Sequence, residues 1–102
     1  MKKQFDINKI PLEFKEDLEK AISILKDLGC KEIYIFGSLI EGNVNNDSDI
    51  DLAIKGISEK SYFFIWSKLY MALKHKVDLV NLDKGDRFSN FLQKEGLLSR
   101  VA

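Results

Sequence analysis

The chain has 102 residues, 45% hydrophobic and 31% charged, which is typical of a single globular domain spanning residues 1–102 with one core. Its 16 Lys and Arg residues balance its 16 Asp and Glu residues, so we expect no direct nucleic-acid binding, because nucleic-acid-binding proteins need a surplus of positive charge. No apolar run is long enough to span a membrane, and the charged N-terminus lacks the apolar stretch of a signal peptide, so the expected location is cytoplasmic.

The first predicted element is a helix between Pro11 and Gly29, because proline suits the first turn of a helix and glycine suits its end. Apolar side chains recur between them at helical spacing and predict one buried stripe: Phe14, Leu18, Ala21, Ile22, Leu25 and Leu28. Cys30 follows this helix and is the only cysteine, which excludes an internal disulfide. We interpret it as a small buried apolar residue rather than a nucleophile.

A buried strand is predicted next, over the apolar residues 33–36. Gly37 and Ser38 break this strand, and residues 39–41 predict one helical turn before a polar loop over residues 42–48. Gly37 lets the backbone come close to a ligand, and the N–H groups that follow it can face phosphate oxygens.

The loop leads into a second strand, predicted over residues 50–54, and places two acids at its start. Side chains alternate between the two faces of a strand, so Asp49 and Asp51 point to one face while Ile50 and Leu52 point to the other. Two carboxylates on one face form a hard oxygen site that suits Mg²⁺.

A long apolar helix is predicted from an N-cap at Ser58 to about His75. Its core-facing side is Tyr62, Ile65, Trp66, Leu69 and Leu73, with Phe63 and Tyr70 at the margin. Phe64 and Met71 lie on the opposite side, where they make either a second internal contact or a surface for a partner protein. His75 is interpreted as a charge near the helix C-terminus rather than a catalytic group.

A third strand over residues 77–81 carries one more acid, Asp78, among apolar neighbours. A lone buried carboxylate is costly without a partner, which favours a functional role for this residue. After a turn over residues 83–86, Asp86 can cap a last helix that carries Phe88, Phe91 and Leu92 and ends at Gly96. Residues 97–101 predict a short edge strand. This order of helices and strands predicts an α/β domain with a small sheet and helices packed against it.

The combination of Gly37-Ser38, the ten residues 39–48, Asp49-x-Asp51 and a later strand aspartate, Asp78, resembles the nucleotidyltransferase family that includes DNA polymerase beta. The short length is similar to that of the minimal nucleotidyltransferases, the MNT antitoxins of HEPN–MNT toxin–antitoxin pairs. The resemblance covers residues 33–80 and implies the polymerase beta-like α+β fold, a mixed β-sheet flanked by helices with the site at one exposed end.

The resemblance also implies an enzyme, a nucleotidyltransferase that moves AMP from ATP to a hydroxyl, a tyrosine of the partner HEPN toxin, and so neutralises that toxin. Asp49, Asp51 and Asp78 are then the catalytic acids and the ligands of two Mg²⁺ ions, and Gly37 and Ser38 bind the nucleotide. We also expect that the chain can form an oligomer with the toxin.

One departure from the family pattern keeps a second hypothesis open. Many family members carry Arg after the Gly-Ser pair, whereas this chain has Leu39, Ile40 and Glu41, so the triphosphate loses a bidentate partner. Lys55, Lys84 or Arg87 are the cations that could compensate. The alternative is a non-catalytic antitoxin of the same fold that neutralises its toxin by binding alone.

Overall fold

The computed structural model of the protein describes residues 10–37, 40 and 48–102. Short apolar runs form the strands, and the longer segments with helical periodicity form the helices. The elements in chain order are α1 (Leu12–Asp27), β1 (Glu32–Phe36), β2 (Ile50–Lys55), α3 (Glu59–Ala72), β3 (Val77–Asn81), the 3₁₀ turn η2 (Leu82–Lys84), α4 (Arg87–Lys94) and β4 (Ser99–Arg100).

The four strands form one mixed sheet with the order β3-β2-β1-β4. β1 pairs antiparallel with both β2 and β4, while β2 and β3 run parallel. The parallel pair is joined through α3, which supplies the long crossover connection that parallel neighbours require. This arrangement confirms the predicted mixed sheet flanked by helices, including the short edge strand near the C-terminus.

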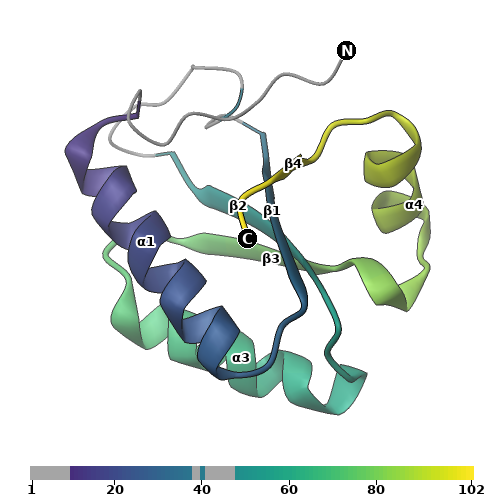
Figure 1. Ribbon diagram of the computed structural model, residues 1–102, viewed down its shortest axis with the longest axis horizontal. Coiled ribbons are helices and arrows are strands. Elements are labelled where there is room, and N and C mark those ends of the chain that lie inside the picture. The colour runs from purple at the N-terminus through teal and green to yellow at the C-terminus, as the bar shows by residue number, and fades with distance from the viewer. Residues whose placement is uncertain (1–9, 38–39, 41–47) are drawn as a thin grey trace.

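The larger core lies between one face of the sheet and helices α1 and α3, which lie on the same side of it in Figure 1. Alternate residues of the strands point into this layer, as the twofold period of a strand requires. The helices contribute the predicted stripes, and Cys30 is buried as expected. The most fully buried members are Leu18, Leu25, Ile33, Ile35, Ile50, Leu52, Ile54, Ile65 and Leu69.

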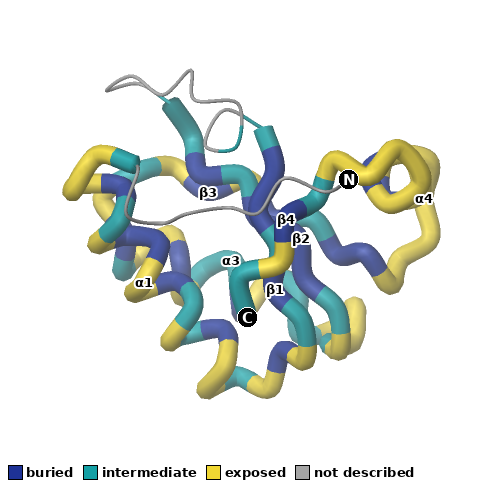
Figure 2. The backbone as a smooth tube through the Cα atoms, turned by 45° about the horizontal axis from the view of Figure 1, so that its top comes forward, coloured by how far each residue is buried: buried dark blue, intermediate teal, exposed yellow. Residues whose placement is uncertain are grey.

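A smaller core lies on the other face of the sheet, where α4 packs. Its buried members are Phe36, Ala53, Leu82 and Leu92. The N-terminus of α4 is capped as predicted, because Oδ1 of Asp86 accepts a hydrogen bond from the backbone N–H of Ser89 at 2.8 Å. Figure 2 shows that most of α4 is exposed. Asp78, on the same face of the sheet, is exposed as well, so α4 covers only part of this face.

The end of α3 differs from the prediction of a helix that continues to about His75. The helix ends at Ala72, and Leu73 already has an extended backbone with φ −98° and ψ 150°. The backbone N–H groups of Lys74 and His75 donate instead to the carboxylate of Asp17 on α1. A buried side-chain acceptor therefore replaces the last helical hydrogen bonds, and the sequence around Lys74 and His75 carries no signal of this.

The outer side of α3 is exposed at both positions that could have made a second internal contact. The exposed fraction is 54% for Phe64 and 85% for Met71, so the internal-contact alternative is wrong. Phe63 and Tyr70, placed at the margin, are also exposed. Within the described part of the chain, no helix is both long enough and apolar enough to cross a bilayer.

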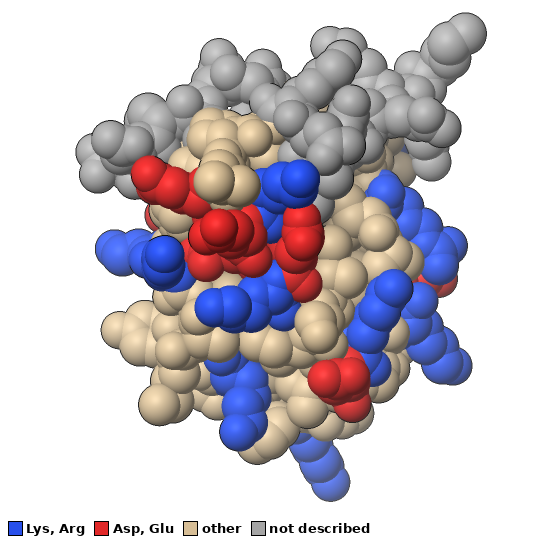
Figure 3. Space-filling view, turned by 60° about the vertical axis from the view of Figure 1, so that its left-hand side comes forward, with Lys and Arg blue, Asp and Glu red and all other residues tan. Residues whose placement is uncertain are grey.

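Charged groups of both signs lie close together on the face drawn in Figure 3. Acidic side chains gather near its centre, and Lys and Arg side chains border them. On this face, charges of the two signs are therefore mixed rather than separated into two patches.

Candidate active site

The candidate site is centred on two aspartates on neighbouring parallel strands. In the β2–β3 register, Asp51 is the direct partner of Asp78, so their side chains emerge on the same face of the sheet. On the antiparallel side, Asp51 is the partner of Phe36, the last residue of β1. The starts of β2 and β3 and the end of β1 therefore meet at one end of the sheet, on the face that α4 only partly covers.

Gly37 closes this end of the sheet immediately after β1. Its backbone has φ 75°, a conformation that residues with a Cβ rarely adopt. A Cβ built on Gly37 would overlap Oδ2 of Asp51 and lie 3.1 Å from its Cγ. Glycine is therefore required for two reasons, the left-handed backbone and the room that the Asp51 carboxylate occupies above it. The expected approach of a ligand to the Gly37 backbone stays a prediction, because the close neighbour in the structure is Asp51.

The burial of the acids corrects one step of the sequence argument. Asp78 is exposed, whereas its neighbours Val77 and Leu79 are buried on the opposite face. The expectation that Asp78 is a lone buried carboxylate was wrong, because strand alternation separates it from the apolar residues beside it. Exposure instead leaves the Asp78 carboxylate accessible to a ligand. Asp51 is half-buried.

Asp49 lies directly before β2, two residues from Asp51 and separated from it by the fully buried Ile50. Across residues 10–37, 40 and 48–102, no group of three His, Cys, Asp or Glu side chains is arranged to hold a metal ion. The structure thus brings Asp51 and Asp78 together without assembling all three acids into one ligand set. Two carboxylates side by side above a glycine nevertheless fit Mg²⁺, which prefers oxygen ligands and uses one or two protein carboxylates.

Several predicted features lie outside the described residues: Ser38, Leu39, Glu41 and the loop over residues 42–47. Ile40 is described; its N–H donates to the carbonyl of Gly37 at 3.1 Å. Its side chain packs against members of both cores. Ile40, one of the three residues that follow the Gly-Ser pair, therefore contributes to packing.

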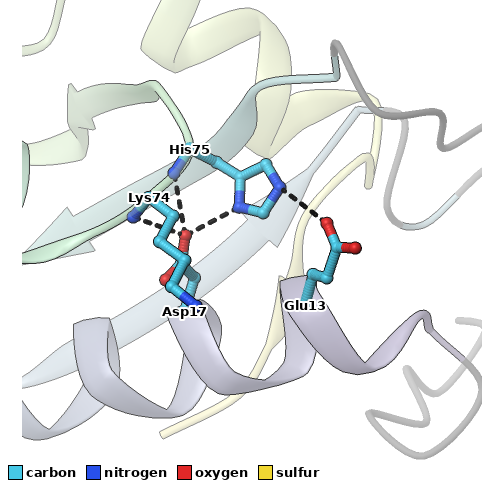
Figure 4. A network of polar contacts seen from close by, with 4 residues as sticks. All are labelled: Glu13, Asp17, Lys74 and His75. Carbon is cyan, nitrogen blue, oxygen red and sulfur yellow. Dashed lines mark hydrogen bonds and ion pairs between the residues drawn. The ribbon is translucent and has the colours of Figure 1, made fainter.

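Away from these acids, the carboxylate of Asp17 on α1 forms a buried polar network with the segment between α3 and β3 (Figure 4). Its Oδ2 accepts hydrogen bonds from the backbone N–H groups of Lys74 and His75, each at 2.9 Å, and from Nδ1 of His75 at 2.7 Å. The imidazole stacks on the ring of Phe14 with a centroid distance of 3.9 Å, and its Nε2 lies 3.9 Å from Glu13.

The charge on Asp17 is stabilised although the residue is only 2% exposed. Burial alone would raise its pKa, but the hydrogen bonds from the His75 side chain and from the backbone of His75 and Lys74 outweigh burial, so the pKa is lowered below its ordinary value. Asp17 is therefore ionised at neutral pH and acts only as an acceptor, so Nδ1 of His75 carries the proton that it donates.

Sequence reasoning missed this network, although one signal was available. Asp17 lies three residues after Phe14 and four residues before Ala21, which places it on the apolar stripe of α1. An acid on the buried side of a helix requires donors from elsewhere in the fold. The sequence does not show which residues supply them, because Asp17 and His75 are 58 positions apart.

Comparison with known proteins agrees with this geometry. The family model described as polymerase beta, nucleotidyltransferase matches residues 19–98, which is more than half of the chain and includes Gly37, Asp49, Asp51 and Asp78. A comparison with curated protein sequences finds no match.

Three similar solved structures are toxin–antitoxin complexes. A toxin–antitoxin with AMP-PNP has a chain 29% identical to this one with a TM-score of 0.65, and the match covers 80% of this chain and 69% of that one. A chain of the toxin–antitoxin MntA-HepT is 25% identical with a TM-score of 0.60, over 84% and 69% of the two chains. A tri-AMPylated Shewanella oneidensis HEPN toxin in complex with an MNT antitoxin gives 25% identity and a TM-score of 0.58, over 84% and 69%.

Proposed function

Since the chain belongs to the polymerase beta nucleotidyltransferase family, we propose that it is an MNT-type antitoxin that transfers AMP from ATP to a tyrosine hydroxyl of a HEPN toxin and thereby neutralises it. The observation that carries the proposal is the register pairing of Asp51 with Asp78 beside Gly37. The AMP-PNP complex and the AMPylated toxin among the similar structures support ATP as the donor and the toxin as the acceptor.

In the proposed reaction, the acceptor oxygen bonds to the α-phosphorus of ATP as the bond from that phosphorus to the leaving pyrophosphate breaks. Asp51 and Asp78, which the structure places side by side, would hold Mg²⁺ together with Asp49, and the ion would neutralise charge on the attacking and leaving oxygens. Asp78 is exposed and accepts the proton of the acceptor hydroxyl. The backbone N–H groups after Gly37 are the proposed donors to the phosphates, and Ser38 is the proposed side-chain partner of the triphosphate.

The accessible position of the two carboxylates matters for a protein substrate. A tyrosine side chain on another protein can reach Asp78 only if the carboxylate is not buried, and the structure shows it exposed. The partly uncovered sheet face beyond α4 supplies the approach. The chemistry and the exposure therefore suit transfer to a macromolecule as well as to a small hydroxyl compound.

The proposal is tested by incubating the partner HEPN toxin with the protein, ATP and Mg²⁺ and measuring the toxin by intact-mass and peptide mass spectrometry. We expect a mass increase of one or more AMP groups, located on tyrosine. An unmodified toxin whose activity is nevertheless blocked would contradict AMP transfer and support neutralisation by binding.

The binding-only candidate is favoured by one surface feature, the exposed apolar side of α3. Phe63, Phe64 and Met71 are 77%, 54% and 85% exposed. Exposed apolar side chains grouped on one helix are characteristic of protein-binding surfaces. If the candidate is correct, Phe64→Ser with Met71→Ser weakens the toxin complex in the absence of ATP, whereas Phe91→Ser on α4, 52% exposed, leaves it intact. Unchanged toxin affinity in the double variant would contradict a role for this surface.

A further inference from the structure

The segment between α3 and β3 is held by a single oxygen atom. Oδ2 of Asp17 accepts from two consecutive backbone N–H groups and from one side chain, all within 2.9 Å. Asp17 is thus connected to residues that lie immediately before β3, and its own backbone belongs to a helix in the larger core. The start of β3 is therefore fixed relative to α1.

This fixed segment also sets the first hydrogen bond between β2 and β3. The carbonyl of Lys76, the residue after His75, accepts the N–H of Ile50 at 2.8 Å. The pair after Ile50 and Val77 in the register is Asp51 and Asp78. The path from Asp17 to the candidate site thus consists of the 74–76 segment and one backbone hydrogen bond, with no flexible loop between them.

The position of this path is significant because the two acids repel each other. Like charges directly opposite on neighbouring strands destabilise a sheet. The repulsion acts where β2 and β3 begin, which is where strands open most easily. Among the described strands, β3 is also at the edge of the sheet and pairs with β2 alone. A fixed start of β3 opposes the separation of Asp51 and Asp78.

We propose that Asp17, acting through His75 and the 74–76 segment, is a positioning residue that holds the Asp51 and Asp78 carboxylates at the spacing needed to share a divalent cation. This inference rests on the proposed function for the identity of the cation and extends it by assigning a role to a residue on α1 that touches neither substrate nor metal. An isosteric amide in place of Asp17 keeps the shape of the side chain but removes the charge that the three donors stabilise.

The first test measures hydrogen exchange of the Ile50 amide by NMR without metal. In Asp17→Asn we expect exchange at least about tenfold faster than in the wild type, as expected when hydrogen bonds to a charged acceptor are lost. The matched control is Leu92→Ala, which removes packing from the smaller core on the α4 side of the sheet. Each variant is measured at the same distance from its own unfolding midpoint. Faster exchange at Ile50 in Asp17→Asn but not in the control supports the proposal.

A general structural role is separated from positioning by a double variant. In the Asp51→Asn background the repulsion is gone, so Asp17→Asn should accelerate Ile50 exchange much less than in the wild-type background. An equal acceleration in both backgrounds, or none in either, overturns the proposal. If Asp17→Asn does not fold, His75→Phe serves instead, because it keeps a ring against Phe14 and removes only the side-chain donor.

The second test titrates Mg²⁺ by calorimetry, independently of activity. We expect Asp17→Asn to bind Mg²⁺ about tenfold more weakly than the wild type, the usual effect of removing a group that orients metal ligands. Unchanged affinity overturns the positioning role. If the wild type binds no Mg²⁺, the metal chemistry of the proposed function fails, and the exchange measurements alone then decide whether Asp17 holds the two strands together.

Discussion

Two groups of carboxylates in this small protein are built in opposite ways. Asp17 is buried and satisfied, with three donors on one oxygen and a lowered pKa. Asp51 and Asp78 are half-buried and exposed, respectively, and stand side by side with the same charge. The hydrogen bonds of the first arrangement stabilise its charge within the fold. We expect a cation between the two carboxylates to stabilise the second, and this difference separates a structural acid from a candidate catalytic one.

The largest expected effect is on transfer activity. Asp49→Asn, Asp51→Asn or Asp78→Asn should each lower AMP transfer at least about a thousandfold without unfolding the protein, since metal stabilisation of the transferring group contributes several kcal/mol. The measurement is the rate of toxin modification by mass spectrometry, with Asp27→Asn, an exposed acid at the end of α1, as control. Transfer at the normal rate by any of the three folded variants would remove that acid from the catalytic set.

Gly37, which lies against the Asp51 carboxylate, offers a test of how the candidate site is packed. Gly37→Ala should lower the free energy of unfolding by about 1–3 kcal/mol, because it adds left-handed strain and a clash with the Asp51 carboxylate. Gly85→Ala is a matched control, since its φ of 72° imposes similar strain and no atom lies within 4 Å of the added Cβ. Denaturant unfolding of both variants isolates the clash. Equal losses would show that the carboxylate does not occupy the space above Gly37.

The buried carboxylate of Asp17 should make the free energy of unfolding depend on pH. Because the pKa of Asp17 is lowered in the folded state, its contribution is fully present above the unfolded pKa, about 4, and is lost as the pH falls through the lowered folded value. Asp17→Asn should cost about 1.5–3 kcal/mol at neutral pH, the value of hydrogen bonds to a charged acceptor. The difference from the wild type should shrink on acidification below pH 4. A difference that is constant between neutral pH and pH 2 would contradict the lowered pKa.

Much of the fold was predictable because the strands are short apolar runs and the helices keep a clear period. The Gly37, Asp51 and Asp78 set was predictable from spacing and from the family resemblance. The exposure of Asp78 was not, because the sequence does not show that β3 is an edge strand or which of its faces is covered. The partners of Asp17 were not predictable either, because its donors, Lys74 and His75, are 57 and 58 positions away in the sequence. In both cases the missing information was tertiary.

The central question is whether Asp51 and Asp78 form one cation site. The decisive measurement is the melting temperature of the wild type and Asp51→Asn, each in EDTA and in saturating Mg²⁺ with ATP. Close carboxylates repel by up to about 4 kcal/mol at about 4 Å with an effective dielectric near 20. Asp51→Asn should therefore melt at or above the wild type in EDTA and gain less from Mg²⁺ and ATP, which stabilise the folded chain by mass action. Equal gains for the two proteins, or a variant several degrees less stable in EDTA, would contradict a shared cation site.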